Sequence, residues 1–259
     1  HLTVDATGKY VLVAHYGGGS TTVLPLKKDG HVGPVTSQIE HKGSSVLPRQ
    51  KAPHAHAIHV GPNNKFAFAP DLGIDKVLVF KFDEKTGQIR ETKFGGASVD
   101  PGSGPRHFGF HPNGKYAYVI NEIKQTVTAF GFRAKRGKLR TLQTISTVPE
   151  PVKGNSTAEI LVHPSGKFLY GSNRGHNSIA MFRIDGKTGK LTALGHEPIR
   201  GEIPRNFGID PTGQFLLAAG QRSNNVNVFR IDPETGKLKF TGNSIEVASP
   251  VCVRMILQD

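Results

Sequence analysis

One phrase recurs along the chain at intervals of about 50 residues, and this repeat constrains the fold more than any other feature. Each copy is a short polar turn that ends in a lysine or glutamine followed by an aromatic residue. The copies occupy residues 5–10, 61–66, 111–116, 163–168 and 210–215. A repeat of this length predicts a modular fold in which each copy builds one structural unit.

Every unit has the same predicted internal order. A short apolar strand precedes the turn, as at 108–110, and a second β-rich strand follows it, as at 116–120. A third strand is expected at 76–80, 126–130, 179–182 and 226–229. A hairpin signal with aspartate and glycine, as at 185–189, then leads to a fourth strand. We therefore predict an all-β fold, a β-propeller of four-stranded antiparallel blades.

The length of 259 residues fits one β-propeller domain, 1–259, with five blades and a last strand at 250–256. That strand lacks partners behind it, so we expect it to close a ring with strands that lie upstream of His1. The chain begins in the middle of a predicted strand and without methionine, which leaves any export signal open. No apolar run approaches the roughly 18 residues of a membrane span, so no membrane partner is expected.

Charge is the second constraint on function. Lys and Arg number 33 against 20 Asp and Glu, a formal net charge of +13. The densest basic run, 133–140, falls in a predicted turn, and no basic segment carries interleaved aromatic residues. We interpret most of this charge as solvated surface and expect no nucleic-acid partner. Cys252 is the single cysteine, which excludes an internal disulfide and a thiolate metal cluster.

Comparison of the repeats with one another identifies candidate site residues. Apolar positions keep their character from copy to copy, as at Tyr116, Phe168 and Phe215. Positions at one rim of the predicted blades instead vary among polar and charged types. These are His56, Arg106, Glu122, Glu159, Asn173, Arg174 and Arg205. Equivalent positions of a propeller surround its central channel, so we expect these side chains to converge on one site.

Several motifs together resemble the propeller-type lactonase family, which contains bacterial 6-phosphogluconolactonases and fungal carboxymuconate cyclases. The resemblance runs through segments 17–20, 53–56, 71–77, 104–108, 119–122, 156–159, 171–176 and 249–254. It implies seven blades, which would need about 350 residues at the observed spacing. We therefore expect about two N-terminal blades to be absent from this chain.

The resemblance also implies a central constellation of His56, Arg106, Glu122 and Arg174. Lactone hydrolysis needs a base for water, a donor for the developing oxyanion and charge to hold an acidic substrate. Arg106 and Arg174 suit the anionic group and the oxyanion. The sequence leaves Glu122 and His56 as alternative bases. Substrate contacts are expected from His54, Glu159, Asn173 and Arg205, where Glu159 has the alternative role of orienting an arginine.

Structural roles compete with these assignments. Glu122 can pair with Arg106 in a purely architectural way. His54 and His56 have a spacing used by metal sites, but a clear third ligand is missing, and we predict neither a metal nor a cofactor. Rings that bond to backbone are expected for the turn histidines, and turn formation for three aspartates. These are His59, His111 and His163, and Asp75, Asp185 and Asp232.

The predicted activity is hydrolysis of a small anionic lactone, 6-phosphogluconolactone, by a cytoplasmic enzyme. A cyclase or lactonase for a muconate-type lactone is the close alternative. The alternative from another class is a non-catalytic propeller that binds a ligand or protein on its rim. That alternative predicts that the rim residues do not converge. Oligomeric state stays open at this point.

Overall fold

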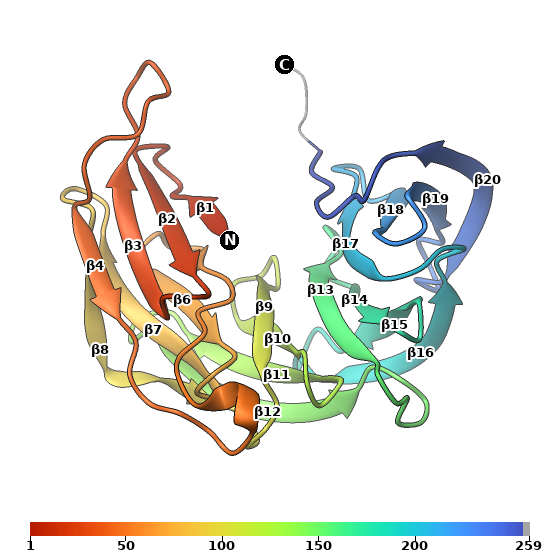
Figure 1. Ribbon diagram of the computed structural model, residues 1–259, viewed down its shortest axis with the longest axis horizontal. Helices are drawn as coiled ribbons and strands as arrows, with labels where there is room; N and C mark the ends of the chain where they lie inside the picture. Colours follow the sequence, from red (N-terminus) through yellow and green to blue (C-terminus); the bar gives the residue numbers. More distant parts are fainter. Residues whose placement is uncertain (256–259) are drawn as a thin grey trace.

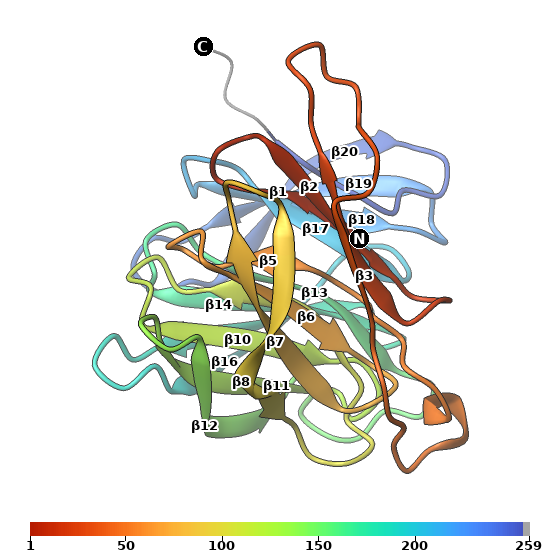
Figure 2. The same cartoon turned by 90° about the vertical axis from the view of Figure 1, so that its left-hand side faces the viewer.

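The computed structural model describes residues 1–255 and consists of five four-stranded antiparallel sheets. The sheets follow one another in chain order around an arc, and the first and fifth sheets flank its open side (Figure 1). The only helical element among these residues is the single 3₁₀ turn η1 (Pro48–Gln50), between the first and second sheets. Figure 2 shows that η1 and the long β3–β4 loop lie beyond opposite ends of the strands of the first sheet. The predicted fold class is confirmed.

The strands of each sheet are consecutive in the sequence. The first sheet contains β1 (Leu2–Val4), β2 (Tyr10–His15), β3 (Ser20–Pro25) and β4 (Ser37–Glu40). The second contains β5 (His59–Val60), β6 (Phe66–Asp71), β7 (Lys76–Asp83) and β8 (Gln88–Ser98). The third contains β9 (Pro105–Phe110), β10 (Tyr116–Asn121), β11 (Thr126–Arg133) and β12 (Lys138–Ser146). The fourth contains β13 (Ser156–Val162), β14 (Phe168–Arg174), β15 (Ser178–Ile184) and β16 (Leu191–Pro198). The fifth contains β17 (Pro204–Ile209), β18 (Phe215–Gly220), β19 (Asn225–Ile231) and β20 (Leu238–Glu246).

Four apolar clusters form the core, and each lies between two neighbouring sheets. Leu169 of β14 packs toward the third sheet, whereas the adjacent Phe168 and Tyr170 pack toward the fifth. Successive side chains of a strand point to opposite faces, so a strand that is buried on both faces needs a continuous apolar run. This explains why the second strand of each repeat is apolar throughout rather than alternating.

A repeated aromatic–glycine contact joins each sheet to the next. The ring of Tyr116, which opens β10, lies against Gly189 in the hairpin between β15 and β16. Gly189 has φ +72°, and a Cβ there would stand 2.3 Å from the Tyr116 ring. Equivalent contacts join Tyr10 to Gly87, Phe66 to Gly137 and Phe168 to Gly236. The aromatic residue that ends the recurring phrase and the glycine of the hairpin signal are therefore the two residues that make this contact between sheets.

Turn histidines add a polar contact to two of these joints. The Nε2 of His111 donates to the carbonyl of Gly166 (2.9 Å), and that of His163 donates to the carbonyl of Gly213 (2.8 Å). The backbone-bonding role predicted for both rings is confirmed. For His59 the prediction is wrong, because its buried Nε2 has no partner within residues 1–255.

The turn between the second and third strands holds the loop that enters the next sheet. Asp75 has φ +52°, and its carboxylate accepts from the amides of Gly102 (2.6 Å) and Gly104 (2.7 Å). At the equivalent place, Asn177 accepts from the amide of Ile203 (2.9 Å). Asp75 is thus a turn residue, as predicted, and also a link between sheets. Asp185 and Asp232 close Asx turns on the amides that follow them.

The tail departs from its predicted strand. Residues 250–255 form no strand, and Ile256 lies outside the described residues. The tail nevertheless runs beside β17, where the amide of Val253 donates to Asn206 Oδ1 (2.7 Å). A strand is defined by a ladder of backbone hydrogen bonds, and no described segment offers that ladder to the tail. Within residues 1–255, no helix is long and apolar enough to cross a membrane.

Substitution of Gly189 by alanine tests the sheet-to-sheet joint. We expect G189A to lower the free energy of unfolding by at least about 2 kcal/mol, because the new Cβ meets Tyr116 and a positive φ strains any L-residue. Gly186 lies in the same hairpin with open space around it, so G186A is the matched control. Urea unfolding of both variants measures the effect, and equal stabilities would contradict the proposed joint.

Candidate functional site

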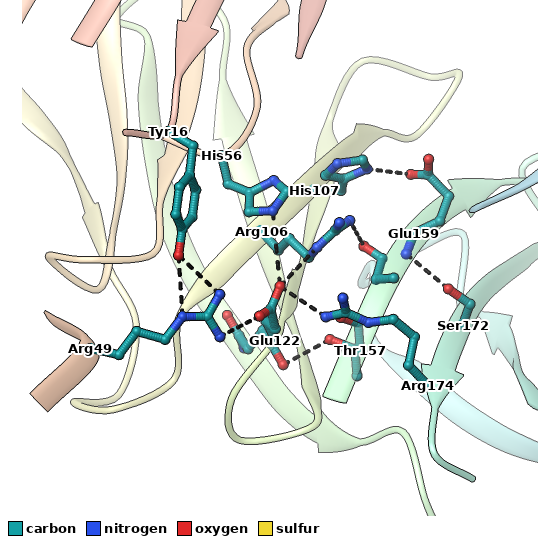
Figure 3. Close-up of polar contacts among 12 residues, drawn as sticks. Tyr16, Arg49, His56, Arg106, His107, Glu122, Thr157, Glu159, Ser172 and Arg174 are labelled. Atoms are coloured by element: carbon teal, nitrogen blue, oxygen red, sulfur yellow. Dashed lines mark hydrogen bonds and ion pairs between the residues drawn. The ribbon is translucent and has the colours of Figure 1, made fainter. Parts of the chain in front are cut away.

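Charged side chains from several sheets meet around Glu122, which directly follows β10. Arg106 reaches it from β9 and Arg174 from β14, while His56 precedes β5 (Figure 3). The four residues of the predicted central constellation therefore lie together, although they are far apart in the sequence. A fifth residue, Arg49 of η1, joins them from the opposite side (Figure 3). The non-convergent rim expected of a purely binding propeller is not observed.

Three arginines hold the Glu122 carboxylate. Arg49 Nη1 donates to Oε1 (2.6 Å) and Arg106 Nε donates to Oε2 (2.9 Å), while Arg174 Nη2 forms an ion pair with Oε2 at 3.0 Å. Burial alone would raise the pKa of Glu122, but the three guanidinium groups together lower it. Glu122 is therefore ionised at neutral pH and is a weak base in this state.

Arg106 and Arg174 are also fixed by the backbone of β13. Arg106 Nη1 donates to the carbonyl of Ala158 (2.8 Å), and Arg174 Nη2 donates to that of Thr157 (2.8 Å). Burial and the charge of Arg174 lower the pKa of Arg106 to about 10, which still leaves it cationic at neutral pH. Arg174 Nε is buried without a partner within residues 1–255. The cluster thus presents fixed cationic side chains, and one of their N–H groups, Arg174 Nε, has no hydrogen-bond partner among the described residues.

His56 stands at the edge of this cluster as a neutral ring. Its Nε2 lies 3.9 Å from Glu122 Oε2, and its ring meets that of His107 edge to face at 5.3 Å. Burial and then the charge of Arg106 lower the pKa of His56, so the ring is unprotonated at neutral pH. An unprotonated imidazole beside cationic donors has the form that a general base requires.

A second carboxylate orients a second histidine. His107 Nδ1 lies 2.8 Å from Glu159 Oε1, and Glu159 also accepts from the amide of Ile160 (3.0 Å) and from Asn206 Nδ2. Burial raises the pKa of Glu159 and lowers that of His107. The sequence offered an arginine as the alternative partner of Glu159. In the structure Glu159 forms an ion pair with an arginine, Arg254, whose Nη2 lies 3.8 Å from Oε2, so that alternative is met. Its closer partners are His107 and Asn206, and together the three side chains link the inner strands β9, β13 and β17.

The other residues predicted to contact the substrate lie at different distances from the cluster around Glu122. His54 Nδ1 donates to the carbonyl of Tyr16 (3.0 Å), and its ring stacks on Tyr16 at 4.6 Å, beside the cluster. Arg205 is partly buried, and its charge contributes to the lowered pKa of His56. Asn173 does not join the site, because its buried amide bonds with both polar groups of Thr147 (2.8 Å each).

Sequence comparison of the repeats missed Arg49 and Tyr16. Arg49 lies in the connection between two sheets, which has no equivalent in the other repeats. Tyr16 occupies the rim position after β2 that is equivalent to Glu122 and Arg174, and this equivalence was the signal that could have identified it. Its hydroxyl accepts from Arg49 Nε (3.2 Å) and Nη2 (2.9 Å). No group of three His, Cys, Asp or Glu side chains within residues 1–255 is placed to hold a metal ion.

Five antiparallel sheets in a propeller arrangement, with a buried arginine–carboxylate cluster at their inner strands, define a β-propeller with a charged centre. The chain belongs to the Lactonase, 7-bladed beta-propeller family, whose model matches residues 1–255. A 6-phosphogluconolactonase of Bacillus subtilis (strain 168) is 38% identical over 192 residues, which cover 74% of this chain and 54% of that protein. A 6-phosphogluconolactonase of Formosa agariphila is 40% identical over 200 residues, covering 76% and 56%. The chain therefore spans about half the length of these curated relatives.

Solved structures agree with this assignment. The periplasmic gluconolactonase PpgL of Pseudomonas aeruginosa has a TM-score of 0.91 and 34% identity, covering 98% of this chain and 71% of that chain. A protein from Lactobacillus plantarum has a TM-score of 0.93 and 31% identity, covering 99% and 74%. The five sheets described above thus superpose on most of a longer propeller in each case.

Buried neutral histidines make the stability depend on pH. Burial and then the charge of His107 lower the pKa of His59 from 6.5 to about 3. The unfolded chain binds this proton below about pH 6.5 and the folded chain does not, so stability falls from pH 6.5 toward pH 3. For His59 the expected loss at pH 5 is about 2 kcal/mol. In H59Q, urea unfolding at pH 7 and pH 5 should therefore show a smaller difference than in the wild type. An unchanged difference would mean that His59 is protonated in the folded protein.

Proposed function

We propose that the protein hydrolyses an anionic sugar lactone, with 6-phosphogluconolactone as the substrate. The observation that carries this proposal is the meeting of three arginines on one buried carboxylate, beside a neutral histidine. These groups supply the charge and the base that lactone opening requires. The relatives named 6-phosphogluconolactonase and gluconolactonase support the same reaction class.

In this proposal Arg106 and Arg174 stabilise the oxyanion. Water attacks the lactone carbonyl carbon, the carbonyl oxygen gains negative charge, and fixed guanidinium donors offset that charge without reorganising. The bond from the carbonyl carbon to the ring oxygen then breaks. The proton removed from water passes to the ring oxygen, which becomes a hydroxyl group. No cofactor enters this sequence of bond changes.

Of the two bases left open by the sequence, the geometry favours His56. Glu122 is ionised, but three arginines occupy both of its oxygens, so neither oxygen is free to accept a proton from water. Its role in the proposal is to align the guanidinium groups. His56 is neutral, partly open to solvent and within 3.9 Å of that carboxylate. We assign proton abstraction from water to this ring.

A phosphorylated substrate would place the enzyme in the cytoplasm, which is where we propose that it acts. A cyclase or lactonase for a muconate-type lactone would need the same donors and base. A lactonase would hydrolyse the muconate-type lactone, whereas a cyclase would form it by adding a carboxylate across a double bond. An assay with both lactones separates these activities from hydrolysis of 6-phosphogluconolactone.

Substitution of Arg106 tests the oxyanion role. We expect R106A to lower kcat/KM for 6-phosphogluconolactone by about 100-fold to 1,000-fold, because a preorganised donor is lost. E122Q should also lower it, since the arginines lose the charge that aligns them. Arg183 is an exposed arginine over the ring of Phe168, so R183A is the matched control and should keep wild-type activity.

The assay uses the protein at its full natural length and subtracts spontaneous lactone opening. Hydrolysis no faster than background in the wild type would overturn the lactonase proposal. Wild-type rates in R106A and E122Q would instead show that the reaction takes place elsewhere on the protein.

The pH profile tests the proposed base. An ordinary histidine with pKa 6.5 would be mostly protonated at pH 5, and kcat/KM would fall about 30-fold between pH 8 and pH 5. Because the pKa of His56 is lowered, protonation begins only at more acidic pH. We expect kcat/KM to stay within about two-fold from pH 7 to pH 5. A midpoint near pH 6.5 would exclude His56 in this environment.

A further inference from the structure

We propose that Arg49 and Tyr16 form the subsite for the phosphate group of the substrate and set the preference for phosphorylated over unphosphorylated sugar lactones. This inference rests on the proposed lactone hydrolysis and assigns its specificity to an arginine from the connection between two sheets and to Tyr16, which is equivalent by repeat to Glu122 and Arg174.

Arg49 is the accessible member of the arginine cluster. Its side chain is 51% exposed, compared with 3% for Arg106 and 12% for Arg174. Arg106 and Arg174 are each fixed by a backbone carbonyl of β13. The hydrogen bonds of the Arg49 guanidinium go to two side chains instead, those of Glu122 and Tyr16. Its donors can therefore be redirected to an incoming anion without breaking backbone contacts.

The loop that carries Arg49 has its own anchors. Ser45 Oγ donates to Asp75 Oδ2 (2.5 Å), and Gln50 Nε2 donates to Asp75 Oδ1 (2.9 Å) and to the carbonyl of Leu72 (2.8 Å). Gln50 is fully buried, whereas its neighbour Arg49 points toward the cluster (Figure 3). Because buried contacts on both sides hold the loop, an arginine is not needed there for its fold. The exposed ion pair contributes little stability by itself.

The donors around Arg49 suit a phosphate. Its planar guanidinium provides paired donors that match two phosphate oxygens. The Tyr16 hydroxyl accepts from Arg49 and donates to no acceptor within residues 1–255, so its proton is free for a third oxygen. The stacked ring of His54 and the edge of His56 hold the Tyr16 ring in place. The three arginines also outnumber the single carboxylate, which leaves net positive charge for a dianionic group.

The position of Arg49 relative to Arg106 and Arg174 supports separate roles in phosphate binding and in oxyanion stabilisation. Arg49 contacts Oε1 of Glu122, whereas Arg106 and Arg174 contact Oε2. An anion that binds Arg49 therefore lies on the solvent side of Glu122, away from the two oxyanion donors. A lactone with its carbonyl at Arg106 and Arg174 would extend its remote end toward Arg49.

The test compares phosphorylated and neutral substrates. We would measure kcat/KM for 6-phosphogluconolactone and for gluconolactone with wild-type protein, R49Q and Y16F, all at full natural length. Loss of a charged hydrogen-bonding partner should lower kcat/KM for the phosphorylated lactone by about 10-fold to 100-fold in R49Q, mainly through KM. The preference for the phosphorylated lactone should fall at least about 10-fold, and less in Y16F.

Lys51 supplies the matched control. It is exposed, lies two residues from Arg49 on the same loop and carries the same charge, so K51Q removes an equal charge without touching the cluster. K51Q should keep the wild-type preference. Equal losses on both lactones in R49Q, or the same loss of preference in K51Q, would overturn the proposed subsite.

A direct binding measurement separates this proposal from the proposed function. Calorimetry with 6-phosphogluconate and with gluconate reports recognition of the phosphate without catalysis. Weaker binding of 6-phosphogluconate alone in R49Q would support the subsite even if the wild type hydrolysed neither lactone. Unchanged binding of 6-phosphogluconate in R49Q would overturn it even if hydrolysis were rapid.

Discussion

Each sheet of this protein must be covered on both faces, and this requirement shapes the remaining structure. The second and third strands carry apolar residues on both faces, and a single four-stranded sheet cannot shield them from water. At the four junctions within residues 1–255, neighbouring sheets share one core cluster each, which covers the three inner sheets on both faces and the first and fifth sheets on one. The aromatic–glycine contact, as between Tyr116 and Gly189, fixes the approach of one sheet to the next. Inner strands are thereby brought side by side, which is what gathers the polar site.

The site itself depends on one buried carboxylate, Glu122, whose negative charge is balanced by three arginines. A carboxylate such as Glu122 is costly to bury unless donors surround it, and three arginines satisfy that need. The same contacts hold the arginines at fixed positions before any substrate arrives. Repulsion among the guanidinium groups is reduced by the one carboxylate they share. Glu122 can therefore be essential to a reaction in which it transfers no proton.

Much of the fold was predictable because the physical requirement repeats in the sequence. The positions of Tyr116, Phe168 and their equivalents follow from one packing rule, so five copies reinforce one prediction. Convergence of Arg106, Glu122 and Arg174 was predictable for the same reason, since their equivalent positions share a rim.

The remainder depends on contacts that do not repeat. Arg49 lies in an inserted turn whose position is set by Ser45 and Gln50 on Asp75, a tertiary contact with no periodic signal. Asn173 occupies a rim position, yet its amide is used by the nearby Thr147. The orientation of a side chain at an equivalent position is decided by its local partner, which the repeat does not encode. The tail at 250–255 similarly lacks the ladder that the pattern of its residues predicts.

Asp75 has one further consequence, which concerns how the site could change over evolution. Its two oxygens bond the loop that carries Arg49 and also the loop that leads to Arg106. The two loops therefore share one rigid support, although each contributes a different kind of contact. Residues on the first loop can be exchanged without moving the second, provided that Ser45 and Gln50 keep their bonds. Such an arrangement permits new substrates to be acquired at the loop while the reacting centre stays intact.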